Sequence, residues 1–202
     1  MSEPALLVVA GCNGSGKSSF SKSLVPVDFF PFDYDYHYLK FYASISDSSL
    51  RETMAHNMAF TELENQINRA IINRENFCYE TNFNSTPLHW PAYFKQRGYK
   101  LQLIYLCLNS IDEAKRRVEI RVKNGGHFVS ETEIKKRYYE GFANLNEHFS
   151  YFDVIDLFDT SEYSKEPKYL CSIEEGLVVS KIKLPNYLLN LIPDIAAKIS
   201  SD

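Results

Sequence analysis

The chain has 202 residues and a formal net charge of −4, from 22 lysines and arginines against 26 aspartates and glutamates. This length fits one α/β domain, and the acidic balance argues against a general nucleic-acid-binding protein. No apolar run is long enough to span a membrane, no secretory signal pattern stands at the N-terminus, and four cysteines without a CxxC pair fit a reducing compartment, so we expect a cytoplasmic protein without a zinc site.

The first predicted element is a buried strand over residues 5–10, which leads directly into the sequence Gly-Cys-Asn-Gly-Ser-Gly-Lys-Ser at 11–18. This is a complete G-x-x-x-x-G-K-[ST] phosphate-binding motif, and residues 19–24 can open the helix that the motif requires. Glycines let consecutive backbone N–H groups point at one phosphate, and the helix adds the positive end of its dipole. The sequence therefore predicts a site for a nucleoside triphosphate.

Within this motif we expect Lys17 to reach the β- and γ-phosphates and the Ser18 hydroxyl to ligate Mg²⁺. ATP and Mg²⁺ are accordingly the expected cofactors. The alternative is a glycine-rich turn that binds nothing. The residues expected to hold the nucleotide are Gly11, Asn13, Gly14, Ser15, Gly16, Lys17, Ser18 and Ser19.

Two carboxylates, Asp33 and Asp35, follow an aromatic stretch at 27–33 that is a plausible second strand or a loop into the site. If the segment is extended, both side chains point to the same side. A carboxylate at the carboxyl edge of the sheet can accept the proton of an attacking hydroxyl or hold Mg²⁺ through water. Asp35 is the preferred candidate base and Asp33 the second, the alternative being two solvated loop residues.

A helix is predicted over 50–74, and a strand over 76–80 then ends in Glu80. A carboxylate at the end of an apolar strand is well placed to contact metal or substrate, and Thr81 and Asn82 follow it at the same edge. The alternative for Glu80 is a strand-end residue in solvent.

The strongest predicted strand, over 101–108, follows a helix at 87–97 and ends in Asn109. Because no apolar strand ends in the aspartate of an ordinary Walker B motif, the pattern argues against GTPases and mechanical ATPases.

A basic helix is predicted from residue 110 to 122, followed by Gly125-Gly126-His127. Arg117 and Arg121 are four residues apart and share one helix face. A glycine joint beside paired arginines suits a lid that closes on a triphosphate and neutralises the charge that develops during phosphoryl transfer. The alternatives are a solvated basic face and, for His127, a loop histidine with a structural hydrogen bond.

The remaining elements are a helix over 130–149, a strand over 151–157, a small hairpin at 169–179 and a terminal helix from Pro185. Helices between short apolar strands predict crossover units and a mainly parallel sheet. We therefore expect a three-layer α/β/α fold of the P-loop NTPase type. It would comprise a kinase-like domain over 1–160 and an appendage over 161–202 packed on the same domain.

The chain resembles the zeta-toxin family of P-loop kinases, and within it a small bacterial branch described as zeta-toxin-like or predicted ATPase. The resemblance spans residue 6 to about residue 158. It rests on the segments 11–18, 32–35, 77–82, 114–118 and 125–127.

The resemblance implies transfer of the ATP γ-phosphate to a hydroxyl of a UDP-sugar, UDP-N-acetylglucosamine in zeta toxins. It implies that Asp35 is the base, that Lys17 grips the phosphates, and that Arg117 or Arg121 stabilises charge. Glu64, or Glu62 beside it, would touch the sugar. The family's arginine beyond the lid helix has no clear match, because residues 125–127 occupy that region.

Three functions follow as hypotheses. The leading one is an ATP- and Mg²⁺-dependent kinase of a small hydroxylated molecule, for which Thr81, Asn82, Glu80, Glu64 and His127 are candidate acceptor contacts. The second is a nucleotide-dependent ATPase or switch that acts on a protein partner. The third is an inactive nucleotide binder that works by association, such as a toxin held by an antitoxin.

Overall fold

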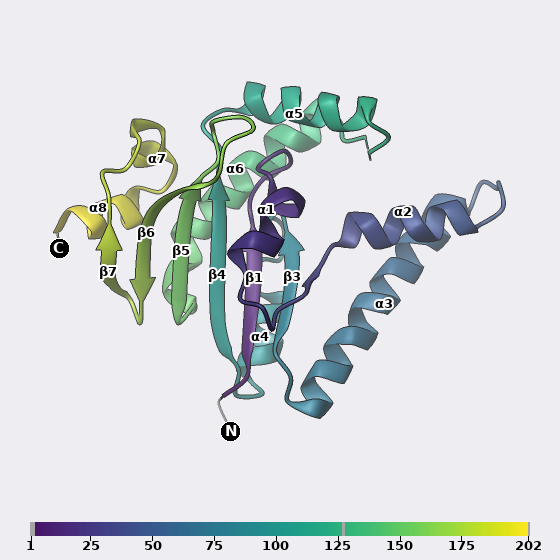
Figure 1. The fold of residues 1–202 in the computed structure, drawn as a ribbon, viewed down its shortest axis with the longest axis horizontal. Helices are drawn as coiled ribbons and strands as arrows, with labels where there is room; N and C mark the ends of the chain where they lie inside the picture. The colour runs from purple at the N-terminus through teal and green to yellow at the C-terminus, as the bar shows by residue number, and fades with distance from the viewer. Residues whose placement is uncertain (1–2, 127, 202) are drawn as a thin grey trace.

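The computed structural model describes residues 3–126 and 128–201 and is built around a seven-stranded sheet with the order β2-β3-β1-β4-β5-β6-β7 (Figure 1). The strands β1 to β5 pair in parallel, whereas β6 and β7 are antiparallel to their neighbours. The strands are β1 (Ala5–Ala10), β2 (Pro31–Phe32), β3 (Phe77–Thr81), β4 (Lys100–Cys107), β5 (Val154–Asp159), β6 (Lys168–Glu174) and β7 (Leu177–Lys181).

Helices α1 to α6 lie between the parallel strands in the chain, and α7 and α8 follow the last strand. The helices are α1 (Lys17–Leu24), α2 (Tyr34–Ser44), α3 (Arg51–Asn73), α4 (His89–Lys95), α5 (Ile111–Lys123), α6 (Glu131–His148), the 3₁₀ turn η1 (Phe149–Tyr151), α7 (Asn186–Leu191) and α8 (Pro193–Ser201). Among the residues that the structure describes, no helix is both long and apolar enough to cross a membrane.

Apolar side chains of β1 alternate between two cores on opposite faces of the sheet. Leu6 and Val8 belong to the large core that includes buried side chains of α3, α4, α5 and α6, whereas Leu7 and Val9 pack with Phe29 and the end of α1. All six residues of β1 are buried, as expected for a central parallel strand covered on both faces. The three-layer α/β/α fold predicted from the sequence is thereby confirmed.

Helices α5 and α6 each begin at a serine N-cap. The Ser110 hydroxyl accepts from the Glu113 N–H at the start of α5, and the Ser130 hydroxyl accepts from the Glu133 N–H at the start of α6. Both caps satisfy backbone donors that the helix leaves unpaired. In Figure 1, α5 runs across the carboxyl ends of the strands, which is the edge where α/β proteins bind ligands.

Two parts of the sequence prediction were incomplete. Helix α2 was not predicted, because its sequence YDYHYLKFYAS is dominated by aromatic and β-favouring residues with weak helix propensity. The predicted C-terminal hairpin is formed by β6 and β7, but its pairing with β5 through β6, which makes it part of the central sheet, was not predicted. Side chains of α7 and α8 also join the large core, including Leu188, Ile192 and Ile195.

Candidate functional site

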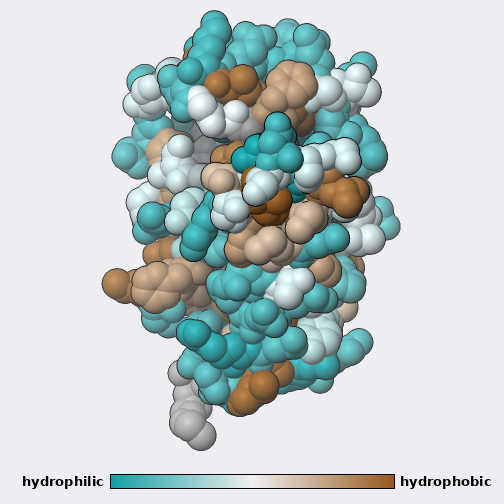
Figure 2. Space-filling view, turned by 90° about the vertical axis from the view of Figure 1, so that its right-hand side faces the viewer, coloured by the Kyte–Doolittle hydropathy of each residue, from teal (hydrophilic) through white to brown (hydrophobic). Residues whose placement is uncertain are grey.

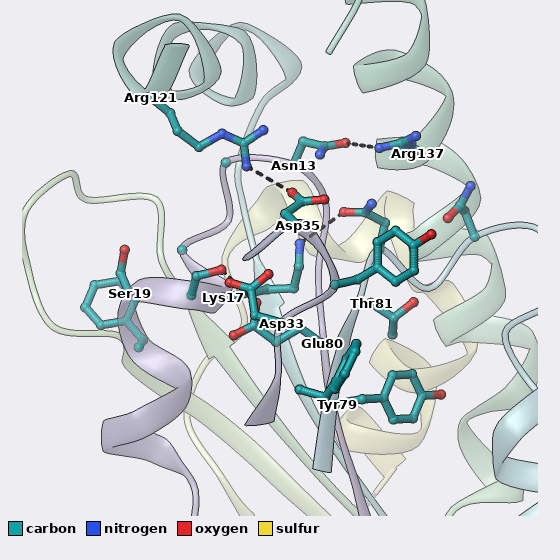
Figure 3. Close-up of a pocket in the computed structure, with 18 of the residues that line it drawn as sticks. Asn13, Lys17, Ser19, Asp33, Asp35, Tyr79, Glu80, Thr81, Arg121 and Arg137 are labelled. Carbon is teal, nitrogen blue, oxygen red and sulfur yellow. Dashed lines mark hydrogen bonds and ion pairs between the residues drawn. The ribbon is translucent and has the colours of Figure 1, made fainter. Parts of the chain in front are cut away.

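A cavity of about 840 Å³ opens at the carboxyl edge of the sheet, between the phosphate loop, the α2–α3 pair, α4 and α5 (Figure 3). This volume lies in the upper part of the roughly 300–1,000 Å³ range of ligand pockets. Most of the residues singled out in the sequence line it. They are Asn13, Gly14, Gly16, Lys17, Ser18, Ser19, Asp33, Asp35, Glu80, Thr81, Asn82, Arg117 and Arg121.

The backbone of the phosphate loop is closely packed from below. A Cβ atom on Gly11 would lie 2.5 Å from Ser15 Oγ and 2.6 Å from the Leu106 carbonyl oxygen. A Cβ on Gly14, where φ is +79°, would lie 2.9 Å from the Ala114 carbonyl oxygen on α5. The sequence had suggested that Gly11 and Ser15 both hold the nucleotide. In the structure neither lines the cavity: Gly11 and the fully buried Ser15 support the loop from beneath.

The Lys17 ammonium group is held by three acceptors at the loop. Its Nζ donates to the carbonyl oxygens of Gly11 at 2.7 Å and Cys12 at 3.1 Å, and to Asn82 Oδ1 at 3.0 Å. Burial lowers the pKa of this amine, and the Glu80 carboxylate opposes that shift. Asn82, predicted as a substrate contact, thus lies beside Lys17.

Glu80 at the end of β3 accepts hydrogen bonds from two hydroxyls of α1. The Ser18 and Ser21 Oγ atoms each donate to its carboxylate at 2.8 Å. Burial and the nearby Asp33 raise the pKa of the Glu80 carboxyl. The sequence contains no Walker B aspartate, and the structure places Glu80 against the loop serine where such a carboxylate acts.

The oxygen atoms at this position suit Mg²⁺, which prefers hard oxygen ligands and usually takes only one or two from protein beside those of substrate phosphates. The Ser18 hydroxyl and the Glu80 carboxylate are the residues that would hold the ion.

The two aspartates occupy the start of helix α2, so the condition of an extended 33–35 segment, under which both would point to one side, is not met. Asp33 is the N-cap, and its Oδ1 accepts from the Tyr36 N–H at 3.1 Å. Asp35 lies in the first turn, and its Oδ2 is 3.6 Å from Arg121 Nη1 on α5. Both nevertheless line the cavity, because the cap residue and the first turn face the phosphate loop (Figure 3).

The two predicted lid arginines differ in their surroundings. Arg117, with 9% of its side chain exposed, bonds Glu113 and donates to the carbonyl oxygens of Gly14, Thr160 and Ser161. Its guanidinium group therefore ties the phosphate loop to the segment after β5. Arg121, with 38% of its side chain exposed, faces Asp35.

Some predicted contacts lie elsewhere. Neither Glu64 nor Glu62 is among the described residues that line the cavity, because α3 turns His56, Phe60 and Leu63 toward it. Glu62 accepts instead from the Gln66 amide on the same helix. The prediction for His127 falls outside the described residues.

Arg137, a weaker candidate from the sequence for charge stabilisation, also lines the cavity: its Nη1 donates to Asn13 Oδ1 at 3.4 Å, which links α6 to the phosphate loop. Several other lining residues were not singled out from the sequence. Tyr34, His56, Phe60 and Trp90 form aromatic walls away from the loop. Aromatic residues in helices are ordinary core residues, so only the topology reveals that these share a cavity.

No family model matches the chain. An uncharacterized protein of Haemophilus influenzae is 39% identical over 44 residues, which cover 22% of this chain and 31% of that protein. Two solved structures are similar over most of the chain. The AvrRxo1-ORF1:AvrRxo1-ORF2 complex with sulphate ions matches with a TM-score of 0.67 at 12% identity, over 94% of this chain and 63% of that one.

The PezAT chromosomal toxin–antitoxin system of Streptococcus pneumoniae matches with a TM-score of 0.58 at 13% identity, over 100% of this chain and 88% of that one. The Pnkp1/Rnl/Hen1 RNA repair complex matches with a TM-score of 0.56 at 20% identity, over 73% of this chain and 47% of that one. The chain thus spans under a third of the curated relative, about half of the RNA-repair chain and under two thirds of the AvrRxo1 chain. At these identities the likeness establishes the fold alone, which is a three-layer α/β/α fold.

Proposed function

We propose that this protein is an ATP- and Mg²⁺-dependent phosphotransferase that moves a γ-phosphoryl group to a hydroxyl of a small molecule. The observation that carries the proposal is the convergence of Lys17, Glu80, Asp35 and Arg121 on one cavity above the phosphate loop. A nucleotide switch needs the first two of these residues, whereas a carboxylate facing the loop from another element is what an acceptor hydroxyl requires.

Each residue has a distinct part in the proposed reaction. Lys17 and the loop amides bind the β- and γ-phosphates, and the Ser18–Glu80 pair would hold Mg²⁺, which neutralises phosphate charge when bound. Asp35 accepts the hydroxyl proton as the new oxygen–phosphorus bond forms. Arg121 stabilises the charge that collects on the transferred group.

Arg117 takes a different part in this proposal from the one that the sequence suggested. Four hydrogen-bonding partners already engage its guanidinium group, among them the carbonyl oxygen of Gly14 in the loop. It acts as a positioning residue for the phosphate loop, and Arg121 is the arginine that contacts phosphate. Asp33 acts through the start of α2, because its carboxylate caps that helix and so orients Asp35.

The acceptor is a small hydroxylated compound, and a UDP-sugar is the member of this class that the zeta-toxin resemblance implies. A mass-spectrometric screen of products formed from ATP and a pool of sugars, sugar nucleotides and nucleosides tests the proposal. We expect one compound to gain the mass of one phosphoryl group. ATP turnover without any phosphorylated product would contradict it.

A protein partner is a second proposal. The AvrRxo1 structure and the PezAT system are by their names two-component assemblies. On this chain the α2–α3 side exposes apolar side chains, and Figure 2 shows brown patches among the polar surface of that side. The exposed apolar side chains of α3 and the residue before it include Leu50, Met54 and Met58. An inhibitor protein that covers this side is the antitoxin-like partner we would expect, and loss of its binding in Met54→Lys and Met58→Lys variants tests it.

A further inference from the structure

The cavity has two ends that differ in charge. Among the described residues that line the cavity, every lysine and arginine lies at the phosphate-loop end or pairs with Asp35. Lys17 belongs to the loop, and Arg117 and Arg137 donate to Gly14 and Asn13 of the loop. The fourth, Arg121, pairs with Asp35. These four cations match a nucleoside triphosphate, whose charge lies at that end.

The opposite end is aromatic. Tyr34 and His56, from α2 and α3, lie nearly parallel, with ring centroids 6.1 Å apart and an interplanar angle of 20°. Phe60 of α3 faces Trp90 of α4 with centroids 6.4 Å apart, and His89 meets Trp90 edge-on at 4.6 Å. The Phe60 side chain remains 45% exposed, so its ring is open to a ligand.

Polar groups without formal charge complete this end. Asn84 and Thr86, on the segment between β3 and α4, also line the cavity. Amide and hydroxyl groups can hydrogen-bond the edge of a heterocycle, while the aromatic rings contact its faces. A diphosphate in the acceptor would place two or more negative charges at the aromatic end of the cavity. The four described lysines and arginines that line the cavity lie at its other end, so they would not offset the desolvation of these charges.

We propose that the phosphoryl acceptor is a neutral alcohol that carries a planar heterocycle, a nucleoside, and not a sugar nucleotide. This inference rests on the proposed phosphotransferase function and narrows its substrate class. The heterocycle packs against the ring faces that the α3 and α4 walls present to the cavity, and the sugar directs a hydroxyl toward Asp35. Aromatic stacking selects the ring, and the uncharged walls select against a phosphorylated acceptor.

The transfer balances without another reactant. A nucleoside hydroxyl oxygen forms a bond to the γ-phosphorus of ATP, and the bond from that phosphorus to the β,γ-bridging oxygen breaks. Asp35 takes the hydroxyl proton, and ADP leaves with the bond's electron pair. The products are a nucleoside monophosphate and ADP.

Trp90 supplies a direct readout, because it is the only tryptophan in the chain and it lines the acceptor end. The full-length protein is loaded with a non-hydrolysable ATP analogue and Mg²⁺, and Trp90 fluorescence is followed during titration with uridine, UDP and UDP-N-acetylglucosamine. Adenosine, guanosine and cytidine are titrated in parallel. We expect at least one nucleoside to change the fluorescence with saturation, and each phosphorylated compound to bind at least tenfold more weakly than its parent nucleoside.

Two matched variants locate the binding. Phe60→Ala should weaken nucleoside binding roughly tenfold, the effect of losing one stacking ring. Phe30→Ala, which removes a ring that is 83% exposed and outside the lining residues, should leave binding unchanged. Calorimetry with ATP should give the same affinity for both variants and the unmodified protein, which shows that Phe60→Ala is folded.

Tighter binding of UDP-N-acetylglucosamine than of uridine, or no fluorescence response to any nucleoside, would overturn the inference. Phosphoryl transfer to the UDP-sugar would then leave the proposed function standing. Saturable nucleoside binding without transfer from ATP would instead keep the acceptor site and overturn the phosphotransferase function.

Discussion

Arg121 Nη1 on α5 lies 3.6 Å from Asp35 Oδ2 on α2, so the group proposed to stabilise charge pairs with the group proposed to accept a proton. The two residues come from opposite sides of the cavity mouth (Figure 3). Arrival of a triphosphate offers Arg121 a stronger anionic partner and leaves Asp35 available to the acceptor hydroxyl.

Replacing Arg121 by alanine should lower kcat about 100-fold, because the developing charge loses a fixed cation. The dissociation constant for ATP should change much less, since Lys17 and the loop remain. Arg121→Lys should recover part of the rate. Lys123→Ala, at an exposed position on the same helix, is the control for a general loss of positive charge. An equal rate loss in Lys123→Ala would argue against a specific role for Arg121.

Replacing Lys17 by alanine should weaken ATP binding by about 10- to 100-fold, the effect of losing a charge-assisted contact with phosphate. Isothermal titration calorimetry measures this directly. Lys22→Ala removes an exposed lysine of the same helix α1 and should bind ATP normally. Unchanged binding in Lys17→Ala would disprove the assignment of the phosphate loop.

Replacing Glu80 by glutamine should have opposite effects on the stability of the fold and on Mg²⁺-dependent activity. The pKa of the Glu80 carboxyl is raised from the ordinary 4.5, so the native protein holds this proton more tightly than the unfolded chain does. Stability is therefore lost as the pH rises from about 4.5 through the raised native pKa, where folding must bury the ionised carboxylate. Without Mg²⁺ at pH 7, Glu80→Gln should be at least as stable as the unmodified protein, and this advantage should vanish below pH 4.5.

The same substitution should raise the Mg²⁺ concentration needed for half-maximal activity, because one ligand oxygen loses its charge. Thermal unfolding across pH and activity across Mg²⁺ concentration measure the two effects. Glu119→Gln, at an exposed site on α5, should change neither. A Glu80→Gln protein with normal Mg²⁺ dependence would remove Glu80 from the proposed metal site.

Arg117 and its neighbour Arg116 offer a matched pair, because both donate to the Glu113 carboxylate. Arg117→Ala should cost about 3 kcal/mol of stability, since it leaves the acceptors of a largely buried guanidinium group without their donor. Arg116→Ala, with 47% of that side chain exposed, should cost much less. Urea unfolding measures both. Equal losses would show that Arg117 does not tie the phosphate loop to the segment after β5.

Much of this arrangement was predictable from local sequence. The strand over Ala5–Ala10, the glycine loop and the caps at Ser110 and Ser130 follow from backbone chemistry and hydrophobic pattern, which act over a few residues. Glu80 was found because a carboxylate that ends an apolar strand is costly without a role.

The remaining features depend on tertiary contacts that no local pattern encodes. Helix α2 forms from residues with weak helix propensity because Asp33 caps it and α3 packs along it. The face that α3 presents to the cavity carries His56 and Phe60 and not the predicted Glu64, since the acidic positions fall on another side of the helix. Likewise, the carbonyl partners of Arg117 come from a segment more than 40 residues away in the chain.

In the proposed reaction, Asp35 accepts a proton from an acceptor hydroxyl while the phosphate loop holds ATP. Transfer of label from γ-³²P ATP to the acceptor found in the product screen, compared between the unmodified protein and Asp35→Asn, tests it most directly. We expect labelled product to form about 10²- to 10⁴-fold more slowly in Asp35→Asn, with ATP affinity within a few-fold of normal. Product formation at the normal rate in Asp35→Asn would show that Asp35 is not the base.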